Sequence, residues 1–299
     1  VTQLEMMALT NVAVWLGDGP VAGVKVKQLR MSIFQANMEV LYMLISSLLP
    51  AVLLIGYVRY RDRRRPEPMM RIIQAVIYGL FSAFLAVPLA MALEGLVYSS
   101  GYGIFAVLPF VRGVFSAFVG AAIPEESMKL LMLWLMLRNC DDFDEAMDGI
   151  VYAVCIGMGF AGLENVLYVF QSEDGWATTA LMRSLLAVPG HYIFAVLMGF
   201  FYSLAHFYPR RYRKYRYFIW LAPVLAHGIY DAILMVGAEH ELLSMLSYIP
   251  LVIFCVWMHR FCLKRFAHAE RLDEDTADIA TFCAAVSQEQ FLRTPHRPM

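Results

Sequence analysis

The side chains of this chain that could do chemistry lie inside apolar segments, where charge is costly. A charged side chain at the centre of a membrane helix costs about 2.5–3.5 kcal/mol on insertion scales, so such residues usually face a bundle interior and serve a function. In chain order they are Glu125, Glu126, Lys129, Glu164, Asn165, His191, His227 and Asp231. Carboxylates and histidines together can transfer protons or bind a metal ion.

The first group is a Pro-Glu-Glu-Ser-Met-Lys segment that ends at Lys129. Glu125 and Glu126 precede Lys129 by four and three residues, so on a helix all three side chains lie close together. Lys129 can neutralise one carboxylate, and the other can take a proton from water. Pro124 removes a backbone donor and kinks the helix, which leaves room for water. The alternative is an ion pair that only holds helices together.

The other groups are single residues on three further apolar segments. Glu164 continues a stripe of small residues along 153–161, which predicts that it faces a neighbouring helix. His191 follows a Pro-Gly pair, and His227 precedes Asp231 by four residues. Asp231 can accept from one imidazole nitrogen and leave the other aimed at a metal or substrate. Each residue taken alone could also be a satisfied structural group.

The rest of the chain predicts helices that would position these groups in a membrane. Of its 299 residues, 60% are hydrophobic and 16% are charged, against about 45–50% and about 25% in soluble domains. Apolar runs long enough to span, at roughly 20 residues each, cover 38–58, 72–97, 113–137, 149–170, 184–206, 218–237 and 245–263. We therefore predict an all-α, polytopic membrane bundle of about seven transmembrane helices.

Basic residues orient this bundle. They gather after the first, fifth and seventh runs, between Arg59 and Arg71, Arg210 and Arg216, and Arg260 and Arg265. Lys and Arg mark the cytoplasmic side, so we expect the N-terminus outside and the C-terminus in the cytoplasm. The predicted division is an extracytoplasmic or interfacial segment (1–37), a transmembrane domain (38–263) and a cytoplasmic polar tail (264–299). The protein is expected to be a multi-pass protein of the cell membrane, in contact with the bilayer and not with nucleic acid.

Taken in order, these motifs resemble those of a known family. They are Pro-Glu-Glu at 124–126 with Lys129, Asp-Gly-Ile-Val-Tyr at 148–152, Gly-x-Gly-Phe-Ala-x-x-Glu-Asn at 157–165, Pro-Gly-His at 189–191, and His-x-x-x-Asp at 227–231. The pattern resembles the PrsW family of bacterial intramembrane proteases, which is related to the CAAX prenyl endopeptidases and the bacteriocin-immunity-type membrane proteins. The resemblance covers about residues 40–263.

This resemblance implies a peptidase that hydrolyses a peptide bond of a membrane-anchored substrate. In the family's best-known role the substrate is an anti-sigma factor, cut on the outer side of the membrane as the first step of stress signalling. By motif match, Glu125 is the general base that activates water. Glu126 assists it or pairs with Lys129.

The resemblance also assigns roles to the remaining residues. It implies that His191 and His227 polarise the scissile carbonyl and stabilise the oxyanion. Asp231 orients His227. Glu164 has no clear counterpart in the CAAX endopeptidases and is the PrsW-like feature, with Asn165 in a supporting place.

Three alternatives stay open. A zinc-dependent version would use His191, His227 and Glu164 as ligands, with one open position. The chain has no His-Glu-x-x-His motif, and we expect catalysis without a cofactor. A proton-coupled transporter also needs charged residues in the membrane, but no internal repeat is visible. A non-catalytic scaffold that binds membrane proteins would not require this set of carboxylates and histidines.

Overall fold

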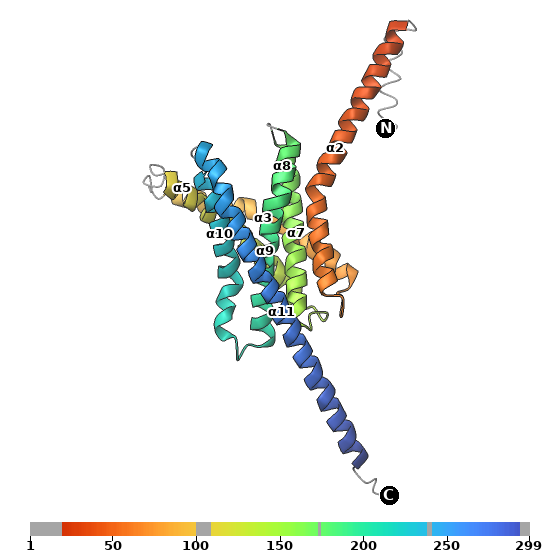
Figure 1. The fold of residues 1–299 in the computed structure, drawn as a ribbon, viewed down its shortest axis with the longest axis vertical. Coiled ribbons are helices and arrows are strands. Elements are labelled where there is room, and N and C mark those ends of the chain that lie inside the picture. Colours follow the sequence, from red (N-terminus) through yellow and green to blue (C-terminus); the bar gives the residue numbers. More distant parts are fainter. Residues whose placement is uncertain (1–19, 100–108, 173–174, 238–240, 294–299) are drawn as a thin grey trace.

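A computed structural model gives the fold, and it describes residues 20–99, 109–172, 175–237 and 241–293 (Figure 1). All regular elements in these ranges are helical. They are α2 (Pro20–Arg61), α3 (Met69–Ser99), α5 (Pro109–Phe115), η1 (Ser116–Ala122), α6 (Ile123–Leu137), α7 (Ala146–Phe170), α8 (Trp176–Met182), η2 (Arg183–Ala187), α9 (Val188–Phe207), η3 (Arg213–Tyr217), α10 (Phe218–Gly237) and α11 (Glu241–Arg293). The predicted all-α bundle is confirmed.

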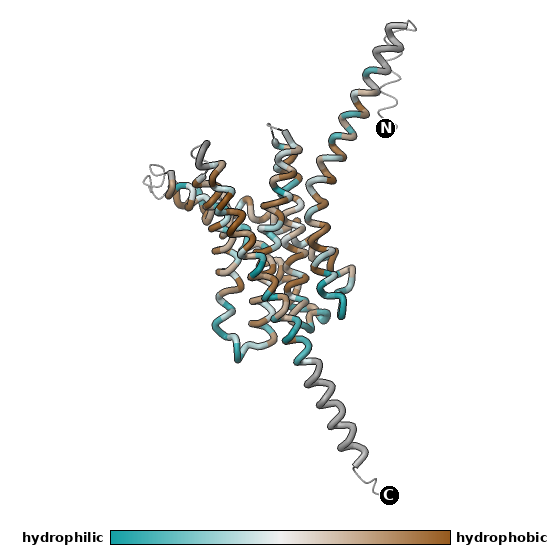
Figure 2. The backbone as a smooth tube through the Cα atoms, in the orientation of Figure 1, coloured by the Kyte–Doolittle hydropathy of each residue, from teal (hydrophilic) through white to brown (hydrophobic). Residues whose placement is uncertain are grey.

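Six helical segments in the described residues are long and apolar enough to cross a membrane. They correspond to six of the predicted runs, and Figure 2 shows them as hydrophobic stretches between hydrophilic loops. The predicted third run, 113–137, lies within three consecutive helical pieces, α5, η1 and α6, each shorter than a full span. This continuous helical stretch, with a π-helical segment in its middle, carries the first group of candidate catalytic residues.

Helices α7 and α9 form the centre of the bundle. In the most apolar window of the segment 146–170, 78% of residues are buried, and in that of 176–207, 72%. The corresponding share is 11% for the first span and 33% or less for the other outer spans, so these helices present apolar side chains to lipid. The functional groups on α7 and α9 are therefore held by protein on most sides.

Glycines allow α7 to approach its neighbours closely. A Cβ atom at Gly199 on α9 would lie 2.2 Å from the carbonyl oxygen of Gly149 on α7. A Cβ atom at Gly79 on α3 would lie 2.1 Å from the carbonyl oxygen of Ile156. Both positions need glycine because backbone, not a flexible side chain, occupies the space. Small residues at helix interfaces are how membrane helices pack tightly.

Substitution of Gly199 by Ala is therefore expected to destabilise the protein by about 1–3 kcal/mol, the usual cost of overpacking. The measurement is thermal or denaturant unfolding of the purified protein in detergent. Gly56→Ala on α2 is the matched control, since nothing lies within 4 Å of a Cβ atom there. Equal stability of the two variants would show that α7 and α9 can separate without cost.

The chain enters and leaves the bundle at opposite ends. In Figure 1 the first part of α2 leans away at the top, and α11 projects from the bottom. The seven crossings predicted from the sequence, an odd number, would require this arrangement. Helix α2 begins at Pro20 and α11 continues to Arg293, so neither predicted segment boundary coincides with a helix end. The division into three segments stays a prediction, and residues 1–19 lie outside the described ranges.

Candidate active site

Two helices of the site begin with a proline that follows a π-helical turn. Helix η1 ends immediately before α6, where the N–H of Ile123 bonds to the carbonyl of Phe118, five residues back. Pro124 comes next, and a proline lacks the N–H and clashes with the carbonyl four residues earlier. The π-helical turn of η1 is wider than an α-helical turn and accommodates the proline. Helix η2 precedes Pro189 in the same way, so the predicted kink takes the form of a π-helix at both places.

Lys129 lies at the centre of the cluster. Its Nζ atom is 2.8 Å from Oε1 of Glu126, 3.3 Å from Oε2 of Glu125 and 3.1 Å from Nδ1 of His191. The ammonium also lies 3.9 Å from the ring centroid of Phe160, a cation–π contact. The residue is 3% exposed. Lys129 thus contacts both predicted glutamates at once and links α6 to α9.

His227 on α10 faces carboxylates on both sides of its ring. Nε2 is 3.2 Å from Oδ2 of Asp231, the contact that the four-residue spacing predicts, and 3.9 Å from Oε2 of Glu125. Nδ1 lies 2.9 Å from Oε1 of Glu126. The second nitrogen was expected to point at a metal or substrate. It faces the buried Glu126, because α6 packs directly against α10.

Glu164 binds His191, as its position on the small-residue stripe suggests. Its Oε2 lies 2.8 Å from Nε2 of His191 and 3.0 Å from Nη2 of Arg183. Nε of Arg183 donates to Oδ1 of Asn165 at 2.7 Å, and Nδ2 of Asn165 donates to the carbonyl of Ser47 at 3.1 Å. Arg183 is a site residue that the sequence interpretation missed.

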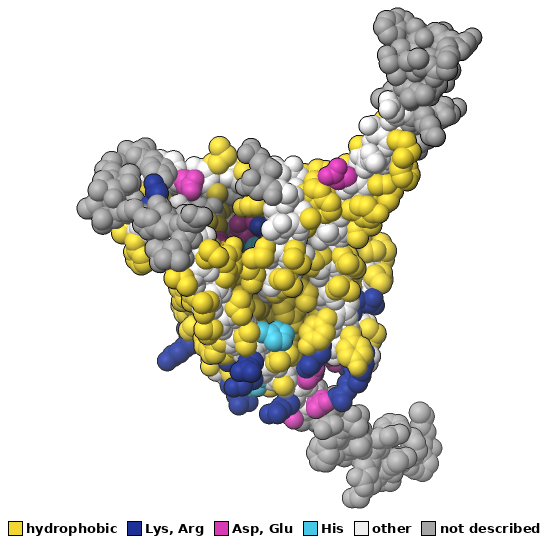
Figure 3. Space-filling model, turned by 45° about the horizontal axis from the view of Figure 1, so that its top comes forward, with side chains coloured by type: hydrophobic (Ala, Val, Ile, Leu, Met, Phe, Trp, Pro, Cys, Tyr) yellow, Lys and Arg dark blue, Asp and Glu magenta, His cyan; other side chains and the backbone are white. Residues whose placement is uncertain are grey.

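A cavity of about 280 Å³ opens onto these groups. Its polar lining comes from Glu125, Glu164, Arg183, His191, His227 and Asp231, and Figure 3 shows a hollow in the apolar surface with charged side chains in its depth. Glu126 and Lys129 are not in the lining. The side chain of Glu125 is 16% exposed and that of Glu126 is 0% exposed, so the two adjacent glutamates differ in access to the cavity.

The donor atoms of the cluster fit a metal ion. Glu125, Glu126, His191 and His227 each offer one ligand atom, and the four atoms lie within 4.8 Å of one another. Oε2 of Glu126 is buried and has no hydrogen-bond partner among the described residues. Carboxylates and imidazoles are ligands that zinc accepts. The set differs from the predicted one, because Glu164 instead holds the other nitrogen of His191, as an outer partner of a metal ligand does.

Comparison with known proteins identifies the family of this chain. The profile of the PrsW family intramembrane metalloproteases matches residues 51–258, more than half of the chain. The chain belongs to the PrsW family. It is therefore a peptidase, and its apolar helices place it in the cell membrane as a multi-pass protein. The family predicted from the motifs is confirmed.

Similar proteins named Protease PrsW come from several bacteria. The chain is 32% identical over 188 residues to the Geobacillus kaustophilus (strain HTA426) protein, covering 62% of this chain and 76% of the relative. It is 30% identical over 210 residues to the Bacillus subtilis (strain 168) protein, covering 70% and 88%. For Halalkalibacterium halodurans the identity is 27% over 231 residues, covering 77% and 98%. No solved structure matches the chain.

Arg183→Lys is expected to lower kcat/KM by about tenfold. A lysine cannot reach Glu164 and Asn165 with a planar fork, and loss of one charge-assisted hydrogen bond costs about 1.5–3 kcal/mol. Glu164 then holds His191 less firmly. The measurement is cleavage kinetics with the purified protein, and Arg210→Lys is the control because Arg210 is exposed. Unchanged kinetics of Arg183→Lys would remove Arg183 from the positioning of the site.

Proposed function

We propose that this protein is an intramembrane endopeptidase that cuts a membrane-anchored protein, with Glu125 as the general base. The supporting observation is the difference between the two glutamates. Glu125 lines the cavity, whereas Glu126 is fully buried between Lys129 and His227. Only Glu125 of this pair can meet water and a substrate carbonyl in the cavity.

The proposed reaction moves one proton through Glu125. Its carboxylate takes a proton from water while the water oxygen attacks the carbonyl carbon of the scissile bond. The carbonyl oxygen becomes an oxyanion, which His191 and His227 would stabilise from the wall of the same cavity. The C–N bond then breaks, and Glu125 returns its proton to the leaving amine. Asp231 holds His227 in place through the 3.2 Å contact.

The buried groups would support this step through charge. Lys129 lies within 3.3 Å of both glutamates, so its ammonium compensates their negative charge. Glu164 would keep His191 oriented, and Arg183 would keep Glu164 oriented. A buried polar network is most effective when all its members have partners.

We propose that the reaction runs without a resident cofactor, because the Lys129 ammonium already contacts three of the four donor groups. The same set, Glu125, Glu126, His191 and His227, would hold zinc if Lys129 moved aside. A bound zinc ion would polarise the carbonyl and lower the pKa of its water. The description of the family as metalloproteases makes this the first alternative to test.

The proposed substrate is a protein with a single membrane span, and an anti-sigma factor is the first candidate. This part of the proposal is supported by the resemblance to the family's best-known role. The position of the cavity also suits such a substrate. It lies away from the end where basic loops gather, which the distribution of Lys and Arg predicts to be cytoplasmic.

The test of the function is co-expression with a library of single-span membrane proteins from the host, followed by identification of fragments by mass spectrometry. We expect fragments with the wild type that are absent with Glu125→Gln and with His227→Ala. If no fragment depends on either residue, the proposed peptidase mechanism is wrong. Proton-coupled transport and non-catalytic binding would then be tested with the same variants.

Removal of metal is expected to leave cleavage unchanged. The purified protein is dialysed against a zinc chelator and assayed on a substrate found in that screen, with and without added zinc. Lys129 supplies the positive charge that a zinc ion would otherwise provide, which is the reason for the expectation. Loss of activity with the chelator and recovery with zinc would instead establish the metal-dependent reaction.

A further inference from the structure

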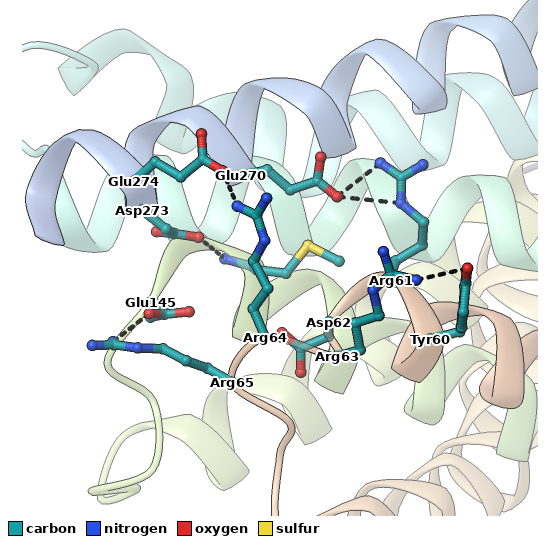
Figure 4. Close-up of a pocket in the computed structure, with 11 residues that line it drawn as sticks. Tyr60, Arg61, Asp62, Arg63, Arg64, Arg65, Glu145, Glu270, Asp273 and Glu274 are labelled. Atoms are coloured by element: carbon teal, nitrogen blue, oxygen red, sulfur yellow. Dashed lines mark hydrogen bonds and ion pairs between the residues drawn. The ribbon is translucent and has the colours of Figure 1, made fainter.

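A second polar cavity lies at the other end of the bundle. It has a volume of about 520 Å³, and it is enclosed by the loop after α2, the start of α7 and the polar part of α11 (Figure 4). Glu164 is 18 positions beyond Ala146 on α7, which is roughly 27 Å at about 1.5 Å per residue. The cavity is therefore separate from the active site.

The four arginines of this cavity already have partners. Arg61 donates to Glu270 at 2.8 Å, Arg63 to the hydroxyl of Tyr60 at 2.7 Å, Arg64 to Glu274, and Arg65 to Glu145. Figure 4 shows each of these contacts as a dashed line, and it shows none for Asp62. Five carboxylates line the cavity with these four arginines, so its lining has one surplus negative charge; they are Asp62, Glu145, Glu270, Asp273 and Glu274.

Asp62 is the carboxylate left over. It is 5% exposed, and its Oδ2 has no hydrogen-bond partner among the residues that the structure describes. The carboxyl receives one hydrogen bond, from the backbone of Glu67. A buried carboxylate in this situation needs a proton or a cation.

Two further carboxylates converge on Asp62. Asp62, Glu145 and Asp148 each offer an oxygen, and the three oxygens lie within 4.8 Å of one another. Glu145 pairs with Arg65 through one oxygen, and its side chain also accepts the backbone N–H of Asp148. Asp148 receives the backbone N–H groups of Asp144 at 2.9 Å and Glu145 at 2.6 Å on its Oδ2. These bonds, together with a hydrogen bond to the side chain of the buried Glu67, fix the Asp148 carboxyl group in one orientation.

We propose that Asp62, Glu145 and Asp148 form a binding site for a hard divalent cation, Mg²⁺. Mg²⁺ in proteins is usually bound through one or two carboxylates and keeps several of its waters, so not all three residues need to bind it directly. The cavity beside Asp62 has room for those waters. Because the basic loops predict that this end faces the cytoplasm, the site would meet the Mg²⁺ of that compartment.

The cation would join elements that are otherwise held by surface ion pairs. Asp62 lies just after α2, and Asp148 and Glu145 lie at the start of α7. Asp273 of α11 also accepts the N–H groups of Ala146 and Met147, at 2.7 and 3.0 Å. A bound Mg²⁺ would therefore fix the loop between α2 and α3 to the N-terminal end of α7.

The test uses Mn²⁺ as a paramagnetic probe for the Mg²⁺ site in the full-length protein in detergent. Free Mn²⁺ is measured by electron paramagnetic resonance, and Mg²⁺ is added as competitor. The variants are Asp62→Asn and Glu145→Gln, which remove a ligand charge. Glu270→Gln is the matched control, since Glu270 lines the same cavity but pairs with Arg61. Glu125→Gln excludes binding at the active-site cluster. Gel filtration and thermal unfolding establish that each variant is folded.

We expect one Mn²⁺ per chain that Mg²⁺ displaces, and an affinity at least about tenfold weaker in Asp62→Asn and in Glu145→Gln. Glu270→Gln and Glu125→Gln should bind as the wild type does. The proposal is overturned if the wild type binds no Mn²⁺ at millimolar concentration, or if folded Asp62→Asn and Glu145→Gln bind it unchanged. Binding that disappears only in Glu125→Gln would place the ion at the active site and would equally overturn it.

Discussion

Glu125→Gln is expected to lower kcat by about 10³-fold, within the range of about 10²–10⁴ that a general base contributes, and to leave the fold intact. Glutamine fills the same space and keeps one oxygen for Lys129, but it cannot take a proton from water. Since the side chain borders the cavity, the loss of charge is not expected to disturb packing. The measurement is steady-state cleavage of an identified substrate, with KM reported beside kcat.

Glu126→Gln is the variant with which Glu125→Gln is compared. Glu126 is fully buried and lies 2.8 Å from Lys129 and 2.9 Å from His227, so its loss should lower stability as well as kcat. If Glu125→Gln kept more than about a tenth of the wild-type kcat, a base contribution of this size would be excluded. If Glu126→Gln alone abolished turnover without loss of stability, the two roles would be reversed.

The sequence was sufficient for six of the spans and for most members of the cluster. Uninterrupted apolar runs mark the spans because the bilayer sets a minimum length. Charged residues inside those runs indicate the site, because a charge is costly in the membrane interior and therefore usually faces the inside of the bundle. Helical spacing also predicted three contacts correctly, those of Lys129 with Glu125 and Glu126 and that of His227 with Asp231. The partners are three or four residues apart on one helix.

Contacts between helices could not be predicted in the same way. Nothing in the spacing indicates that Lys129 reaches His191, or that Nδ1 of His227 faces Glu126. Such contacts depend on the rotation and depth of each helix, which packing determines. The π-helical turns before Pro124 and Pro189 alter that rotation locally, and only the proline itself indicated a distortion.

Arg183 was missed for a different reason. It lies one residue before the predicted start of the fifth apolar run, and an arginine at that place is ordinarily explained by the membrane interface. In the structure it turns into the bundle and reaches Glu164 and Asn165 on α7. Arg183 lies 19 residues after Glu164, so helical spacing could not connect the two. The available signal was that Glu164, an acidic residue inside the membrane, needs a partner.

Lys129→Met is expected to destabilise the protein by about 3–5 kcal/mol, the cost of removing one partner of a buried ion pair. Methionine fills most of the lysine's volume, but Glu125 and Glu126 then lose their shared cation. The measurement is thermal unfolding in detergent, together with the yield of monodisperse protein. Stability equal to that of the wild type would show that Lys129 does not balance the charge of the glutamates.

Two further measurements on this variant separate charge from packing. The double variant Glu126→Gln/Lys129→Met removes one charge of each sign, so it should recover most of the lost stability without recovering activity. Zinc should stabilise Lys129→Met more than it stabilises the wild type, because the substitution leaves the donor atoms of Glu125, Glu126 and His191 without the ammonium that contacts them. A wild type that gains as much from zinc as the variant does would mean that Lys129 and the metal do not compete. The metal would then be held mainly through His227, the one donor of the four that Lys129 does not contact and that borders the cavity.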